Sequence, residues 1–359
     1  MRSKIDEIPY AKAFIYLLIS ILVLTILFLF MKLSPIFGQI FFFIKNLFLP
    51  FFIALIISYL LHPIVTLLHD RGVPRSLAVL LIYIVFFGSV TIISLKAFPL
   101  LVTQIKELGE NLPQIVNHLK SWLDGLRNGY PIPDSIQKGI NHSIQGWETK
   151  LTNIFSHMMD FLGNTISILF TIFLVPFVSF YILKDYKLIE KTVITFVPRK
   201  KRKGMIRLLK EIDEALGNYI RGQLIVITIV GVFAYIGYLI IDLPYPLLLA
   251  FIVSVTDIIP YIGPFIGMAP ALIVAMSISW KMAISVLIVN TTIQALEGNI
   301  IAPQVVGRKL NIHPLLIIFA LLIGGEVGGI FGMILAVPIF AIIKVILQHI
   351  FVYLRKTRA

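Results

Sequence analysis

Three carboxylates in the C-terminal part of the chain have the residue type and the setting for ion chemistry. Beyond residue 242 the sequence contains only Asp257, Glu297 and Glu326 as acids, and each lies within or beside an apolar segment. A charged side chain inside a bilayer is costly and usually faces a cavity or a partner. These acids are therefore candidates for binding a coupling cation or a proton.

Structural roles for the same acids stay open from the sequence. Asp257 and Glu326 could each cap the free amides of a broken helix, because both stand beside helix-breaking residues. Glu297 could instead pair with Arg308 or Lys309 near one membrane surface. Ion binding and structural support are thus alternative hypotheses for each acid.

Polar side chains line one face of the segment that carries Glu297. Asn290, Gln294 and Gln304 are separated from one another and from Glu297 by steps of four, three and seven residues. These steps return to the same face of a helix. We expect this polar stripe to face a solute pathway or the broken segments described below.

The composition indicates that a polytopic membrane protein positions these residues. Of the 359 residues, 58% are hydrophobic and 14% are charged, whereas a soluble domain carries about a quarter charged residues. The net charge is +13, and the basic run PRKKRK lies at 198–203. Because this run is near an apolar span, the excess of Lys and Arg in cytoplasmic loops explains it, and we predict no nucleic-acid partner. The absence of cysteine from the sequence excludes disulfides and thiolate metal sites.

Apolar runs predict how often the chain crosses the membrane. A crossing needs about 20 apolar residues, and the candidates are 13–31, 40–61, 76–98, 161–183, 224–241 and 282–302. Two further segments, 246–278 and 314–347, are longer and are interrupted in the middle. We predict an all-α polytopic membrane protein with about six full transmembrane helices plus two re-entrant helical hairpins, or eight apolar segments.

The distribution of basic residues predicts the orientation. Segment 184–223 holds eleven basic residues against five acids, and segment 99–160 holds five against six. Cytoplasmic loops carry the excess of Lys and Arg. We therefore expect the first segment and both termini to be cytoplasmic and the second segment to be external.

Helix breakers at two places predict that the chain turns back within the membrane. A single helix over 246–278 would be about 50 Å long, far more than a bilayer needs, whereas two arms of about eleven residues would each reach about 16 Å. Proline removes an amide donor and glycine permits turn conformations. The residues expected to shape the two tips are Pro260, Gly263, Pro264, Gly267, Gly325, Gly328 and Gly329.

The two interrupted segments resemble each other. PLLLAF at 246–251 corresponds to PLLIIF at 314–319, and FIGM at 265–268 corresponds to IFGM at 330–333. Each segment follows one span, and the predicted topology makes those two spans run in opposite directions. An inverted repeat of span plus hairpin is typical of secondary transporters, whose sites lie where the broken helices meet.

Five segments follow from this pattern. They are the N-terminal spans at 1–98, an external amphipathic segment at 99–160, a span at 161–183, a basic cytoplasmic segment at 184–223 and a C-terminal transport unit at 224–359. The external and cytoplasmic segments each carry an apolar stripe at helical spacing. We expect both stripes to pack against the bundle or the membrane surface, with a contact between subunits as the alternative.

Three motifs resemble the autoinducer-2 exporter family, also called PerM-like permeases. They are TDIIPYIGPFIG at 256–267, QALEGNIIAPQVVGRKLNIHPL at 294–315 and GGIFGMILAVP at 328–338, with weaker support from VPFVSFYILKD at 175–185. The resemblance implies a bacterial inner-membrane transporter that forms a homo-oligomer, and it suggests a pentamer. The motif positions carried over are Asp257, Pro260, Gly263, Pro264, Glu297, Asn299, Pro303, Gly307, His313 and Pro314.

Our leading hypothesis is a secondary transporter in the lipid bilayer that exports a small polar solute such as autoinducer-2. Sodium/proton antiport through the intramembrane acids is one alternative, although no span carries two closely spaced acids. A membrane scaffold without transport activity is another. The sequence contains no GxxxxGK[ST], HExxH or GxSxG motif, so we predict no enzyme activity, cofactor or metal.

Overall fold

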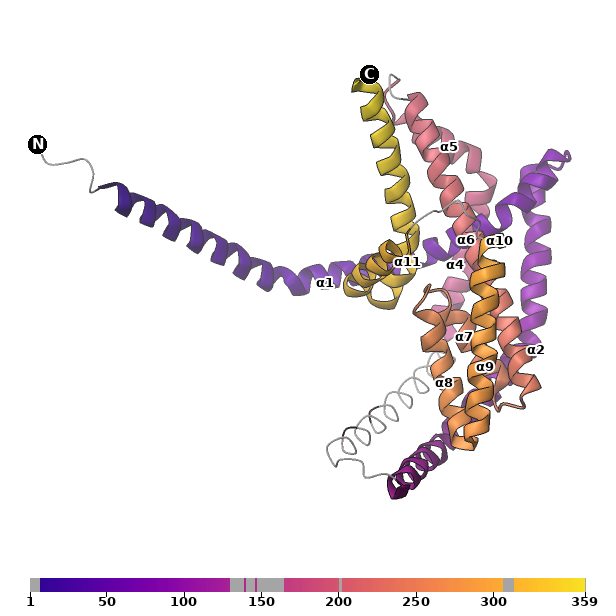
Figure 1. The fold of residues 1–359 in the computed structure, drawn as a ribbon. Helices are drawn as coiled ribbons and strands as arrows, with labels where there is room; N and C mark the ends of the chain where they lie inside the picture. Colours follow the sequence, from indigo (N-terminus) through magenta and orange to yellow (C-terminus); the bar gives the residue numbers. More distant parts are fainter. Residues whose placement is uncertain are drawn as a thin grey trace, which may run out of the picture.

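The computed structural model describes residues 7–129, 139, 146, 165–199, 202–305 and 313–358, and every regular element among them is a helix (Figure 1). The elements are α1 (Glu7–Asp70), α2 (Arg75–Gly129), α4 (Thr165–Lys184), α5 (Tyr186–Thr195), α6 (Arg202–Ile240), α7 (Pro246–Thr256), α8 (Gly263–Ile278), α9 (Trp280–Leu296), a π-helical turn η2 (Glu297–Ile301), α10 (Ala302–Val305) and α11 (Pro314–Arg358).

Five helical stretches among the described residues are long and apolar enough to cross a membrane. They are Leu47–Asp70, Arg75–Ser121, Arg202–Ile240, Trp280–Val305 and Pro314–Phe351. The predicted class, an all-helical polytopic membrane protein, agrees with this finding. The predicted number of crossings and the depth of the hairpins stay predictions.

The first two predicted spans are not separate helices. The runs 13–31 and 40–61 lie in α1, which continues for 64 residues without a break and would measure about 96 Å. The residues between the two runs, KLSPIFGQ at 32–39, do not end the helix, although they include a proline and a glycine. The N-terminal half of α1 projects away from the other helices (Figure 1).

Helix α2 also continues where the sequence predicts a change from membrane span to external segment. It passes through Pro99 without ending. Its apolar stripe is buried at Ile105 and Leu108, which belong to the central hydrophobic cluster. Gln104 accepts a hydrogen bond of 2.9 Å from the amide of Leu248, one of the amides left free in the first turn of α7. Packing against the bundle, as predicted for this stripe, is confirmed here.

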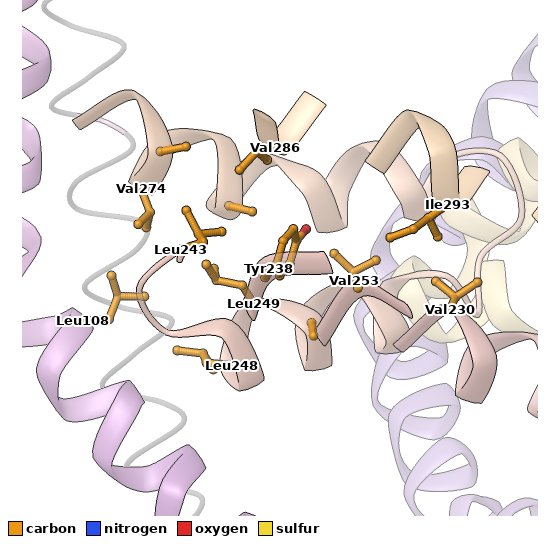
Figure 2. Packing of buried hydrophobic residues seen from close by; sticks show 14 of the residues in the cluster. Leu108, Val230, Tyr238, Leu243, Leu248, Leu249, Val253, Val274, Val286 and Ile293 are labelled. Carbon is orange, nitrogen blue, oxygen red and sulfur yellow. The ribbon is translucent and has the colours of Figure 1, made fainter. Parts of the chain in front are cut away.

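Helix α6 is the element around which the C-terminal helices gather. Val230 and Tyr238 pack with Leu249 and Val253 of α7 and with Val286 of α9 (Figure 2). These side chains are apolar on the face that the helices share, so burying them stabilises the arrangement by about 25 cal/mol per Å² of apolar surface. The core therefore lies between α6, α7, α8 and α9.

The chain reverses between α7 and α8, where the sequence places the first tip. Gly263 lies against the carbonyl of Thr256, and Gly267 lies against Val253, so the two helices run in opposite directions. A methyl group at Gly263 would overlap the Thr256 backbone. Tyr261 in the turn has a φ of 65°, a left-handed conformation. We call this unit the first hairpin, and its ending at mid-membrane stays a prediction.

Helix α11 contains the second reversal. Gly329 interrupts its helical backbone with a φ of 60° and a ψ of −143°. Gly324 and Gly332, which would be about 12 Å apart in a straight helix, lie against each other through their backbones. The arms on either side of Gly329 therefore pack together, and glycine is needed where they approach most closely.

Candidate functional site

Asp257 lies at the C-terminal end of α7, where the first hairpin begins to turn. Its side chain is 2% exposed. Its backbone amide donates to the carbonyl of Val253, and its own carbonyl accepts a bond of 2.9 Å from Nε2 of Gln223 on α6. The Oδ2 atom is buried, and no hydrogen-bond partner for it exists among the described residues.

Glu297 lies where α9 ends and the π-helical turn begins. Turns of this kind are rare and occur often at functional sites. Its Oε2 atom is also buried without a partner in the described part of the chain. Gln294, one helical turn earlier, lies beside the Glu297 carboxyl group. Glu297 is close enough to Asp257 for their charges to interact, so the fold brings two of the three predicted acids together.

This arrangement separates the two roles that the sequence leaves open for Asp257. The N-cap residue of α8 is Ile262, and no side-chain capping hydrogen bond is formed there. Among the described residues, Asp257 is therefore not the N-cap of the helix after the turn. Two nearby carboxylates with buried, unpartnered oxygens cannot both carry charge at low cost, and a bound proton or cation relieves that cost.

The pair does not form a conventional multidentate metal site. Within the described ranges, no cluster of three or more His, Asp or Glu side chains is placed to hold a metal ion. The geometry fits a proton or a weakly held monovalent cation better than Zn²⁺ or Ca²⁺, which take four or more ligands.

The rest of the predicted polar stripe divides into different roles. Asn290 is buried, and its side chain lies 3.0 and 3.1 Å from the hydroxyl of Tyr238 and donates to the carbonyl of Val286. It is thus a satisfied packing residue. Gln304, the last residue of the stripe, is exposed. Asn299, a motif residue outside the stripe, is also exposed and donates to the carbonyl of Ala295. Gln294 is the stripe residue that lies at the acid pair.

The remaining predicted residues lie elsewhere. Glu326 is exposed, near the reversal of α11. His313 precedes α11, and its Nδ1 accepts from the amide of Leu315 at 3.3 Å. Pro303 and Pro314 are exposed. Gly307, together with Arg308 and Lys309 as partners for Glu297, falls outside the described residues.

A second polar cluster was missed by the sequence reasoning. Both oxygens of Asp213 on α6 accept hydrogen bonds, one of 2.7 Å from the hydroxyl of Tyr59 on α1 and one of 2.8 Å from the hydroxyl of Tyr186 on α5. Burial and the bond to Asp213 raise the pKa of Tyr186 to about 12, so its hydroxyl stays a donor at physiological pH.

This cluster lines a cavity of about 320 Å³ between α1, α4, α5 and α6, which we call the tyrosine cavity. His62 packs on the ring of Tyr186 with 4.6 Å between the ring centroids. Gly217 lies against the ring of Tyr59 and allows α1 to approach α6. Among the residues of this cluster, only Asp213 stands out in the sequence, because it is an acid within a basic segment.

The chain is similar in sequence to a family of transporters and to relatives named as transport proteins or as a permease. The sequence model of the family described as AI-2E family transporter matches residues 14–351. YrrI of Bacillus subtilis (strain 168), named as a candidate transport protein, is 39% identical over 93% of this chain and 95% of its own length. YueF of the same organism is 35% identical over 95% and 94%. PerM of Escherichia coli (strain K12), named as a candidate permease, is 29% identical over 87% and 89%.

Proposed function

Because this chain belongs to the AI-2E family of transporters, we propose that it is a secondary transporter in which Asp257 and Glu297 together bind the coupling proton or cation. The observation that carries the proposal is the pair of buried, unpartnered oxygens on these two residues. They come from different segments, so motion of one segment relative to the other changes the site.

The proposed coupling follows from the position of the pair. When the site is empty, two close negative charges repel each other, which favours separation of the first hairpin from α9 and η2. When a proton or cation is bound, that repulsion is removed and the segments can close. A change of this kind is the two-state element that alternating access requires.

The transported solute in this proposal is small and polar, and autoinducer-2 is the first candidate because the chain matches the AI-2E family. We further propose export across a bacterial inner membrane, with both termini cytoplasmic. Assembly as a homo-oligomer, with a pentamer as the form to test first, belongs to the same proposal.

A second candidate function is sodium/proton antiport without an organic solute. No single span carries two closely spaced acids, which by itself disfavours antiport. Asp257 and Glu297 nevertheless interact across separate segments and could together serve as such a pair. Antiport would use the same two carboxylates, alternately protonated and bound to sodium.

Transport in proteoliposomes tests the proposal. Autoinducer-2 is added outside vesicles that hold the purified protein and an imposed pH gradient, and internal solute is measured over time. We expect accumulation that the gradient drives and that Glu297→Gln and Asp257→Asn reduce by at least about tenfold. Glu326→Gln, an exposed acid on α11, is the matched control and should retain the wild-type rate.

A sodium pulse with an internal pH dye separates the two candidates. Antiport predicts a sodium-dependent pH change in the absence of solute, lost in the same two variants. Gradient-driven solute uptake with no response to sodium contradicts antiport. The coupling role of the acid pair is contradicted if uptake is independent of the gradient and is unchanged in both variants, provided that the variant proteins are folded.

A further inference from the structure

We propose that the tyrosine cavity binds a small zwitterionic solute, with its ammonium group at Asp213 and its carboxylate at Arg221. The inference goes beyond the function proposed above, because it adds a zwitterionic class of solute to the autoinducer-2 candidate, and its physiological role rests on that proposed transport activity. The site is separate from the Asp257–Glu297 pair, so the two can be tested independently.

Asp213 supplies the anionic end. A carboxylate has about four acceptor positions, and the hydroxyls of Tyr59 and Tyr186 occupy two of them. No basic side chain in the described part of the chain forms an ion pair with it. Glu214, also in the cavity lining, adds a second negative charge nearby. An ammonium group would find both charge and free acceptor positions here.

Arg221 supplies the cationic end. Its guanidinium donates 3.0 Å to Oδ1 of Asn218 and makes a long contact of 3.5 Å to the carbonyl of Tyr59. A guanidinium has five N–H donors, so donors remain for a carboxylate, which arginine binds best with two parallel hydrogen bonds.

Tyr59 contacts both charged residues. Its hydroxyl binds Asp213 while its backbone carbonyl contacts Arg221. The two charged residues are separated by eight positions on α6, about 12 Å along the helix axis, although the guanidinium of Arg221 reaches back to Gly217, one turn from Asp213. The two side chains form no ion pair with each other in the described part of the chain, and both are only partly exposed. A ligand with opposite charges at its two ends would satisfy both.

The space between the charged ends suits a short carbon chain. The cavity volume of about 320 Å³ is that of a small-molecule site. Leu55, Ile182 and Leu183 contribute apolar lining, and the rings of Tyr59 and Tyr186 add aromatic surface. These features favour an amino acid or ω-amino acid over a compact inorganic ion.

Helix α6 connects this cavity to the acid pair. Gln223, two residues beyond Arg221, donates to the carbonyl of Asp257. A shift of α6 on solute binding would therefore move the backbone of Asp257 directly. This contact gives a physical route by which solute and coupling ion sense each other.

The test is a binding measurement on the full-length protein in detergent without any gradient. Calorimetric titrations use the ω-amino acids from glycine to 6-aminohexanoate, with n-butylamine and butanoate as probes that carry one charge each. We expect at least one zwitterion to bind at least about tenfold more tightly than either single-charge probe. Equal binding of an amine or acid alone, or no binding of any zwitterion, overturns the proposal.

Variants then assign the two ends. Asp213→Asn and Arg221→Gln should each weaken zwitterion binding by at least about tenfold, whereas Glu211→Gln, an exposed acid on the same helix, should not change it. Unchanged binding in folded Asp213→Asn and Arg221→Gln contradicts the assignment. If either variant fails to fold, the probe series on wild type still decides.

The same titrations on Asp257→Asn and Glu297→Gln separate this inference from the proposed function. We expect both variants to retain zwitterion binding while losing gradient-driven uptake. Retained gradient coupling of autoinducer-2 without zwitterion binding would leave the proposed function intact and reject this inference.

Discussion

Asp213 and Asp257 are two aspartates in one bundle whose carboxyl groups differ in their partners. Asp257 is buried and Asp213 is partly buried, and Gln223 of α6, the helix that carries Asp213, reaches the backbone of Asp257. Asp213 receives two tyrosine hydroxyls, while Oδ2 of Asp257 is buried with no partner in the described chain. A carboxylate that accepts a hydrogen bond on each oxygen holds helices together, whereas a buried oxygen without a partner is kept at a cost that a bound proton or ion can relieve.

The largest effect should come from closing the space around Asp257. Gly263→Ala would place a methyl group into the backbone of Thr256, and we expect a loss of about 3 kcal/mol in unfolding free energy, because neither helix backbone can yield. Thermal unfolding in detergent measures this. Gly88→Ala on α2, with no neighbour within 4 Å, is the control and should not destabilise. Equal behaviour of the two variants would show that the first hairpin is not packed as described.

Removing the satisfied carboxylate should be the next largest change. Asp213→Ala leaves the hydroxyls of Tyr59 and Tyr186 without their acceptor, so we expect a loss of about 2 kcal/mol in unfolding free energy. The exposed neighbour Glu211 gives the matched variant Glu211→Ala, which should stay within about 0.5 kcal/mol of wild type. A neutral Asp213→Ala would remove the contrast between the two aspartates.

Neutralising the unsatisfied carboxylate should have the opposite sign. Asp257→Asn keeps the shape of the side chain and removes a buried charge that lies near Glu297. We expect the unfolding free energy at pH 8 to rise by about 1 kcal/mol. If Asp257→Asn lowered the unfolding free energy by as much as Asp213→Ala, Asp257 would have a structural partner, and the contrast between the two aspartates would not hold.

A change of similar size to that of Asp257→Asn, but of opposite sign, is expected within the tyrosine cavity. Tyr186→Phe removes one of the two hydrogen bonds to Asp213 and should lower the unfolding free energy by about 1 kcal/mol. Tyr181→Phe, at an exposed tyrosine on α4, should have almost no effect. If both variants behave alike, the hydroxyl of Tyr186 does not support Asp213.

The sequence identified the acids singly but not their partners. Asp257 and Glu297 were recognisable because a carboxylate is rare in an apolar segment. Their proximity was not, because it depends on how the first hairpin packs against α6 and α9. Tyr59 and Asp213 are 154 residues apart, and a tyrosine in a span has no local signal that it will meet an acid.

Helix reversals were easier to predict than helix continuations. Proline and glycine act on the local backbone, so the turn before Gly263 and the break at Gly329 could be placed from the sequence. The continuity of α1 and α2 could not, because a few polar residues, or a proline such as Pro99, end a helix only when tertiary packing favours the end.

An infrared titration of the purified protein between acidic and alkaline pH, with and without sodium, tests most directly whether Asp257 and Glu297 form a shared site. It follows the carbonyl stretch of protonated carboxyl groups. We predict a band from a buried, protonated carboxyl group, and this band disappears at high pH. If sodium is the coupling ion, added sodium also removes the band. Either Asp257→Asn or Glu297→Gln should abolish it. Glu326→Gln should leave it unchanged. A band that survives unaltered in either of the first two variants would contradict a shared site at Asp257 and Glu297.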